Sequence, residues 1–407
     1  MFFLKLAWRN IFRNKRRTII AGIAIGIGLA CMIFMDALME GMQTNLIDSI
    51  TSTFLGEAQI HDSDYRELKK VELTVNKPQK VLEQLSNDKK IEDYSPRVVS
   101  FGMINSPINV RSIILYGVKP ELEKNISVLD ESIVEGSYLA ENKTGGLLIG
   151  KELAENLEIN LNERVILTLS EVNSGELSQE MLKVKGIFSL AEKEIEKSMV
   201  FIHYQKAQNM LGLDNQFHEI AVTFREKGLA NTEKNYFTEK YTQYGNEAVN
   251  WPTILPSMQM VFNMKNLSLS ISGIIIFGVV IFGIFNTLFM SIYERFFEFG
   301  VVRAVGTRSS GVMKLIILEA FCLGIVSCLM GIILGFGVTY WVSIIGIDYT
   351  GIEFAGATFS NIIYPEMTAT QFILYPVLIL IFVVIVSIYP ALYAGKMKIA
   401  EAMRRSF

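Results

Sequence analysis

The sequence predicts an α-helical membrane protein with four transmembrane helices and an α+β extracytoplasmic domain between the first and second of them. The 407-residue chain is 50% hydrophobic and its mean hydropathy is +0.33, which is high for a soluble protein. Four stretches are nearly free of charge and long enough to cross a hydrocarbon core of ~30 Å. They are Thr18–Met35, Leu267–Ile292, Leu315–Ile347 and Ala369–Ala394.

Charges beside these stretches predict the topology. Basic residues cluster before the first stretch, between the second and third, and after the fourth, whereas residues 348–368 contain no Lys or Arg. By the positive-inside rule, both termini and the loop between the second and third stretches are cytoplasmic. Residues 41–265 and 348–368 are therefore expected on the extracytoplasmic side.

The first helix is expected to extend beyond the membrane, because apolar residues recur every four positions from Leu38 to Phe54. The predicted order along the chain is as follows: a cytoplasmic segment (1–17), transmembrane helix 1 with its extracytoplasmic extension (18–55), an extracytoplasmic α+β domain (56–256) with a β-rich insert (about 121–203), transmembrane helix 2 with its extension (257–292), a cytoplasmic coupling helix (293–314), transmembrane helix 3 (315–347), an extracytoplasmic loop (348–368), transmembrane helix 4 (369–394) and a cytoplasmic tail (395–407).

Alternating apolar residues and turn signals predict the elements of the α+β domain. One helix should begin near Pro78, since proline suits the first helical position, and another should end at Gly212, a plausible C-cap. The predicted strands are Glu57–His61, Arg97–Ile104, Ile113–Val118, His218–Phe224 and Glu247–Trp251. The helix that ends at Gly212 is Tyr204–Leu211, and a further helix is Asn231–Thr242.

The net charge of −3 conceals an uneven distribution. Residues 41–265 contain 24 basic and 32 acidic residues, a net of −8, and the rest of the chain contains 14 and 9, a net of +5. An acidic extracytoplasmic domain argues against a nucleic-acid partner. All three cysteines lie in the predicted spans, so no disulfide framework is expected in that domain.

No catalytic residue or metal site is predicted. The segment Gly145–Glu152, GGLLIGKE, nearly matches a phosphate-binding loop. Such a loop needs Ser or Thr after the lysine, where Glu152 would instead repel phosphate. The segment also falls on the extracytoplasmic side, where ATP is scarce, so a strand leading into a helix at Lys151–Leu157 is the favoured interpretation. The three histidines lack metal-ligand spacing. The chain is therefore expected to have no ATPase site of its own.

The segment Glu294–Ser310, ERFFEFGVVRAVGTRSS, predicts a charged amphipathic helix between two spans. It should begin at Glu294 and end at Gly306. One interpretation is a helix lying on lipid headgroups. The other is a helix that docks in a protein groove, and the two acidic residues, Glu294 and Glu298, favour this second interpretation because an anionic leaflet would repel them.

Two further features leave alternatives open. Glu319 is an acidic residue inside the third span, and it serves either as a structural anchor beside a basic neighbour or directly in coupling. Apolar residues rich in methionine mark the membrane exits of the first two helices. They either pack these helices together or form a surface for lipid or acyl chains. The members of this set are Met35, Met39, Met42, Leu46, Met258, Val261, Phe262 and Met264.

Residues Asn286–Thr307, NTLFMSIYERFFEFGVVRAVGT, followed by Glu319, closely resemble the signature of FtsX-like, MacB-type ABC transporter permeases. Both termini and the external stretch containing GGLLIGKELAENLEINLNERVIL are also similar to that family, so the resemblance covers nearly the whole chain. The layout is similar to that of the lipoprotein-releasing permeases LolC and LolE. One departure from the family's pattern is Ile399, where the family often has proline before the end of the C-terminal tail.

The resemblance implies a MacB-like periplasmic core domain and a location in a bacterial inner membrane. It also implies two permeases, identical or related, that work with separate cytoplasmic ABC ATPases. These ATPases bind ATP and Mg, so no cofactor is expected on this chain. The residues that match the family's ATPase-coupling motif are Glu294, Arg295, Glu298, Gly300, Arg303, Ala304 and Gly306.

The first functional hypothesis is extraction of lipoproteins from the inner membrane for transfer to a periplasmic carrier, with the acyl chains held between the first two helices. The alternatives are MacB-like mechanotransmission for efflux and FtsX-like activation of a cell-wall hydrolase. A third reading, from a different class, is an adhesion or receptor protein that transports nothing.

Overall fold

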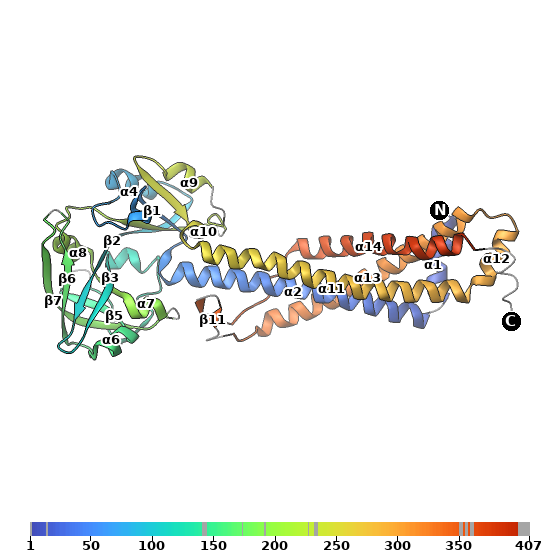
Figure 1. Ribbon diagram of the computed structural model, residues 1–407, viewed down its shortest axis with the longest axis horizontal. Helices are drawn as coiled ribbons and strands as arrows, with labels where there is room; N and C mark the ends of the chain where they lie inside the picture. Colours follow the sequence, from blue (N-terminus) through green and yellow to red (C-terminus); the bar gives the residue numbers. More distant parts are fainter. Residues whose placement is uncertain are drawn as a thin grey trace. The chain divides into compact units, whose positions relative to one another are not determined.

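The computed structural model describes residues 2–13, 15–140, 145–172, 174–190, 193–226, 228–231, 235–349, 353–354, 357–358 and 362–397 (Figure 1). The chain divides into two compact units. The helical unit comprises residues 1–44, 262–348 and 362–407, and the β-rich unit comprises residues 45–261 and 349–361.

Six helices contribute to the helical unit: α1 (Phe2–Arg13), α2 (Lys15–Ile50), α11 (Pro256–Glu294), α12 (Phe296–Ala304), α13 (Ser309–Ile345) and α14 (Ala369–Gly395). Among the described residues, four helices are long and apolar enough to span a membrane, with windows in 18–55, 265–294, 309–345 and 369–395. The helices α2 and α11 continue into the β-rich unit as single helices.

The predicted N-terminal segment, residues 1–17, contains a helix that the sequence analysis did not assign. In α1, Ala7 and Ile11 are buried on the helical unit, whereas Trp8 and Phe12 remain exposed and contact each other with ring centroids 5.3 Å apart. An exposed face of aromatic and basic residues is typical of a helix at a membrane surface.

Small residues bring α2 and α13 into close contact. They recur every four positions on both helices, at 22, 26 and 30 and at 327, 331, 335 and 339. A Cβ atom on Gly331 would lie 2.9 Å from the Gly26 carbonyl oxygen and 2.8 Å from Leu29 Cβ. Because lipid gives helices no hydrophobic reason to associate, such close backbone packing is a main source of their attraction.

The β-rich unit contains ten strands that form one sheet of described residues, in the order β10-β1-β9-β2-β3-β8-β5-β7-β4, with β6 paired to β2 and β7. The strands are β1 (Ala58–Asp62), β2 (Ile91–Asn105), β3 (Val110–Val118), β4 (Ile133–Gly136), β5 (Gly146–Gly150), β6 (Arg164–Ser170), β7 (Leu177–Phe188), β8 (Met199–His203), β9 (Glu219–Phe224) and β10 (Asn246–Asn250).

Short helices cover this sheet: α3 (Tyr65–Leu68), α4 (Pro78–Ser86), α5 (Pro120–Glu123), α6 (Lys151–Leu157), α7 (Lys193–Ser198), α8 (Tyr204–Leu211), α9 (Tyr236–Tyr241) and α10 (Trp251–Ile254). A π-helical turn, η1 (Thr51–Leu55), continues α2, and a hairpin of β11 (Glu353–Phe354) and β12 (Ala357–Thr358) lies in the loop after α13.

The long strand β2 belongs to two arrangements. Its first half pairs with β9, and its second half pairs with β3 and β6. The strands β2, β3, β8, β5, β7 and β6 pair in a closed ring around an apolar core. The strands of the predicted β-rich insert thus pair with β2 and β3, which precede the insert in the chain, to complete this barrel.

Two predicted boundaries also differ. The strand expected at Arg97–Ile104 begins at Ile91. The start was missed because the consecutive acidic residues Glu92 and Asp93 interrupt the alternation of apolar and polar residues that predicts a strand. The helix expected at Asn231–Thr242 begins at Tyr236. Asn235 is the N-cap of this helix, because its side-chain oxygen accepts hydrogen bonds from the backbone N–H groups of Phe237 and Thr238.

We predict that Gly331→Leu separates α2 from α13 and destabilises the protein. An inserted side chain has no space against Gly26 and Leu29, and overpacking costs about 1–3 kcal/mol. Thermal unfolding of the purified full chain in detergent measures this. Gly337→Leu on the same helix is the control, because nothing lies within 4 Å of a Cβ placed there. Equal melting temperatures for the two variants would contradict the prediction.

The β-rich unit should lose stability below pH 6.5. Burial, assisted by the nearby charges of Lys69 and Arg66, lowers the pKa of His61 to about 3. The unfolded chain binds a proton near pH 6.5, whereas the folded chain does not. The free energy of unfolding therefore falls by up to about 1.4 kcal/mol per pH unit between pH 6.5 and 3. Unfolding of the full chain across this range should show a shallower slope for His61→Phe than for the wild type, and identical slopes would refute the assignment.

Candidate coupling site

The segment between the second and third spans is a short helix bounded by two chain reversals. The helix α12 begins at Phe296 rather than at the predicted Glu294, which is the last residue of α11. Arg295 lies between the two helices with non-helical backbone angles (φ −108°, ψ 14°). The helix ends at Ala304, two residues before the predicted end at Gly306.

Gly306 turns the chain back toward α13. Its φ of +107° is in the region that only glycine adopts readily. Polar contacts then tie this segment to the end of α14. Arg303 donates a hydrogen bond to the Met397 carbonyl, and Ser309 donates one to the Gly395 carbonyl. The segment is thus held by the end of α14 as well as by its covalent connections to α11 and α13.

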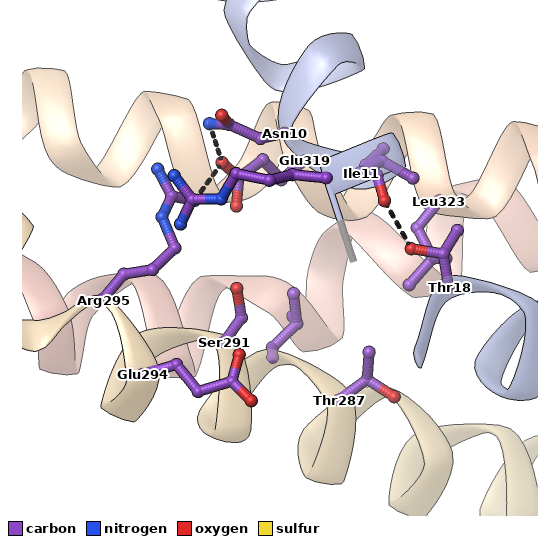
Figure 2. Close-up of a pocket in the computed structure, with 11 residues that line it drawn as sticks. Asn10, Ile11, Thr18, Thr287, Ser291, Glu294, Arg295, Glu319 and Leu323 are labelled. Atoms are coloured by element: carbon purple, nitrogen blue, oxygen red, sulfur yellow. Dashed lines mark hydrogen bonds and ion pairs between the residues drawn. The ribbon is translucent and has the colours of Figure 1, made fainter. Parts of the chain in front are cut away.

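Glu319 lies at the centre of a charge network that joins three helices (Figure 2). Its Oε1 accepts hydrogen bonds from Asn10 Nδ2 of α1 at 2.6 Å and from Arg295 Nη1 at 2.7 Å. Arg295 Nε also donates to Glu298 of α12 at 2.9 Å, and Glu298 accepts from Arg13 of α1 at 3.0 Å. The basic partner of the buried Glu319 is therefore Arg295, one of the predicted coupling residues.

Burial strengthens this network. Glu319 and Arg295 expose only 8% and 11% of their side chains, whereas Glu298 and Arg13 are about half exposed. Although burial disfavours the charge, the carboxylates of Glu319 and Glu298 raise the pKa of Arg295. Burial likewise disfavours ionised Glu298, but Arg295 and Arg13 lower its pKa. The ion pair between Glu319 and Arg295 is the stronger link because its charges are less screened.

A small cavity of about 40 Å³ lies beside the network (Figure 2). Its walls include Asn10, Thr287, Ser291, Glu294 and Glu319. The volume is sufficient for a water molecule with several polar partners. At about 40 Å³ the cavity is too small for a substrate.

The outer face of α12 is apolar and acidic. Phe299 and Gly300 are buried, while Phe297, Val301 and Val302 are exposed by 37–45% and Val305 by 85%. Exposed Glu298 lies on the same short helix. A compact face of this kind, held from behind by an ion pair, is suited to a groove in another protein.

The sequence analysis missed Asn10 and Arg13 as parts of this site. The available signal was the helical spacing of Ala7, Asn10 and Ile11, which places Asn10 on the buried side of α1. The ion pair itself has no local sequence signal, because Arg295 and Glu319 are 24 positions apart.

A second cavity, of about 350 Å³, lies among α2, α11 and α14 of the helical unit. Met32, Met35, Ile276, Phe277 and Leu378 supply apolar walls, and the other wall residues include Asn266, Ser270 and Ser272. The cavity is thus apolar with polar groups on α11.

The predicted acyl-chain residues take different places. Met35 lines the 350 Å³ cavity. Leu46 and Met258, which belong to the β-rich unit, are buried, and so is Phe262 of the helical unit. Met39 and Met42 are half-buried. The side chains of Val261 and Met264 lie outside the part of the chain that the structure describes.

The near match to a phosphate-binding loop forms the strand β5 followed by the helix α6, as the sequence predicts. A Cβ atom on Gly150 would lie 2.2 Å from the Glu196 carbonyl oxygen, so close backbone packing explains that glycine. Glu152 is 3.6 Å from Lys197 in an ion pair.

Two family profiles match the chain. The MacB-like periplasmic core domain matches residues 18–235, which is more than half of the sequence, and the FtsX-like permease C-terminal domain matches residues 270–399. The chain belongs to the FtsX-like, MacB-type family of ABC transporter permeases. It is a permease subunit, a multi-pass membrane protein with an extracellular domain, and its family implies an ATPase partner.

Relatives within this family differ in the function that their names describe. The chain is 22% identical to the lipoprotein-releasing system transmembrane protein LolE of Haemophilus influenzae, over 81% of this chain and 80% of that protein. It is also 22% identical to the macrolide export ATP-binding/permease protein MacB of a Shewanella species, over 84% of this chain and 52% of that protein. The crystal structure of the periplasmic region of MacB from Actinobacillus actinomycetemcomitans covers 50% of this chain at 13% identity, with 92% of its own length matched and a TM-score of 0.34.

We predict that Glu319→Gln destabilises the helical unit. The substitution leaves the buried Arg295 without its carboxylate, and breaking a buried pair costs about 3 kcal/mol or more. Glu298→Gln is the control, since exposed pairs contribute less than about 1 kcal/mol. Thermal unfolding of the full chain compares the two variants. The double variant Arg295→Glu/Glu319→Arg should recover part of the loss, and a double variant no better than Arg295→Glu alone would show that the pair does not interact.

Proposed function

We propose that this permease extracts lipoproteins from a bacterial inner membrane and passes them to a soluble periplasmic carrier. The observation that carries the proposal is the apolar cavity of about 350 Å³ that Met32 and Met35 line on α2. Such a cavity suits an acyl chain, because each methylene group that it shields from water stabilises the bound chain by about 0.8 kcal/mol. The polar residues on α11 suit the ester and amide groups at the head of a lipid anchor. The family relationship to LolE supports the same cargo.

In this proposal the coupling site faces the cytoplasm and the β-rich unit faces the periplasm. The basic residues of α1, including Lys5 and Arg9, favour this orientation. An ABC ATPase binds the exposed face of α12, with Phe297, Val301 and Val302 in its groove. ATP and Mg are held by that partner. A second permease, identical or related, completes the transporter.

The ion pair between Arg295 and Glu319 gives this docking a mechanical consequence. A force on α12 reaches α13 through the ion pair and α1 through Asn10, as well as through the backbone. The four spans then respond together, and rearrangement around α2, α11 and α14 expels the acyl chains. The first two of these helices also enter the β-rich unit.

Filling the cavity should block extraction without blocking ATP hydrolysis. A Cβ atom on Gly273 would lie 3.7 Å from Met32 Cε, so Gly273→Leu occupies the cavity without forcing the helices apart. Losing room for about two methylene groups corresponds to a decrease in lipoprotein release of about tenfold. The measurement is ATP-dependent transfer of a fluorescent triacylated lipoprotein from proteoliposomes, containing the permease and its co-purified ATPase, to a soluble carrier.

Gly278→Leu is the matched control on the same helix, because nothing lies within 4 Å of a Cβ placed at that position. It should release lipoprotein like the wild type. A wild-type complex that hydrolyses ATP without releasing any lipoprotein would refute the proposal. ATP-dependent export of a macrolide by the same vesicles would favour a MacB-like role instead.

A further inference from the structure

The first long helix ends inside the β-rich unit in an unusually complete set of hydrogen bonds. The last carbonyl groups of a helix have no partner within the helix and need others. In η1, the carbonyl oxygen of Ser52 accepts from the Val128 backbone at 2.9 Å, and that of Leu55 accepts from the Gln59 side chain at 2.8 Å. The Phe54 carbonyl accepts from Arg97 Nη2 at 2.6 Å. Three separate segments of the β-rich unit thus hold this helix end.

Arg97 is the central residue of this attachment. It is fully buried in β2, where it makes a two-pronged contact with Glu123 at 2.6 and 3.0 Å and an ion pair with Glu219 at 2.7 Å. Ser95 donates a further hydrogen bond to Glu123 at 2.7 Å. The guanidinium group has a fixed planar arrangement of donors, so these contacts leave one orientation in which it also reaches Phe54.

The ring of Phe54 gives a second attachment. It lies 3.9 Å below the Arg97 guanidinium carbon, and it makes edge contacts with Tyr116 of β3 and Phe201 of β8 at 4.5 and 5.0 Å. These two strands belong to the barrel. The residue at the end of the first helix is therefore fixed at its carbonyl by β2 and at its side chain by the barrel.

The second connection between the helices and the β-rich unit is built differently. After β10, the four-residue helix α10 ends at Ile254, and the next residue, Leu255, has non-helical angles (φ −120°, ψ 72°). The helix α11 then begins at Pro256, which has no backbone N–H group to continue a hydrogen-bond ladder. A break in the helix therefore separates α11 from the body of the β-rich unit, whereas α2 runs into it through η1 without a gap in helical structure.

We infer that α2, and not α11, carries movement into the β-rich unit, and that Arg97 is the positioning residue that transmits it. The inference rests on the chain's being an ABC permease and is independent of the cargo. A rigid attachment transmits rotation and displacement, whereas a connection with a break absorbs them. ATP-driven changes in the spans thus enter the extracellular domain at Phe54 and spread along β2.

Two matched insertions test the inference. Two glycines are inserted after Ile50, between α2 and η1, in one variant and after Leu255 in the other, each in the full chain co-purified with its ATPase in nanodiscs. The readout is the difference in backbone hydrogen exchange of β1 and β2 between the nucleotide-free complex and the complex trapped with ATP and vanadate. We expect the insertion after Ile50 to abolish this difference and the insertion after Leu255 to retain most of it, with ATP hydrolysis preserved in both.

A milder substitution is needed if the insertion after Ile50 prevents folding. Arg97→Lys keeps the charge between Glu123 and Glu219 but cannot make all the contacts of the guanidinium group. Its nucleotide-free exchange should match the wild type, while the ATP-dependent difference is largely lost. Arg225→Lys is the control, since Arg225 bonds the Ile91 carbonyl at the far end of β2. A difference that survives the insertion after Ile50 or Arg97→Lys, or an equal loss from the insertion after Leu255, would overturn the inference.

Discussion

The arrangement of the helical unit depends on one ion pair, between Glu319 and Arg295. A carboxylate in the apolar part of a membrane protein is costly unless it is paired and hydrogen-bonded. Here the cost is offset by Arg295 and Asn10. Since these partners belong to different segments, the carboxylate can be satisfied only when α1 and the junction of α11 with α12 are both in place. The ion pair thus links the position of a short exposed helix to that of a long buried one.

The contact between α2 and α13 has the opposite physical character. It contains no charge, and its geometry is set by the absence of side chains at Gly26 and Gly331. Close packing of this kind tolerates little change in distance, whereas a charged pair tolerates small shifts at modest cost. The helical unit therefore combines a stiff seam between two spans with a more adjustable polar junction at its end.

Sequence patterns were sufficient for the parts of this protein that obey local rules. Span positions follow from apolar length, and the strand-to-helix transition at Gly150 follows from alternation and turn signals. Asn10 was missed because the helix α1, whose buried side carries it, was not predicted. Nor did sequence patterns reveal that β2 completes the barrel. That pairing depends on contacts between segments such as Asn105 and Ile166, which only the folded chain brings together.

The double membership of β2 has a consequence for how the extracellular domain can deform. The register of β2 is fixed from Asp93 onward, after an irregularity between Ile91 and Asp93, and a slip of one residue would turn every following side chain to the opposite face. The half of β2 beside β9 therefore cannot slide without disturbing the half beside β3 and β6, and a closed barrel has no free edge at which to relieve such a shift. A displacement that begins on the β9 side of the sheet is thus relayed by β2 to the barrel, so that a partner bound to the barrel would sense an event at the other half of the strand.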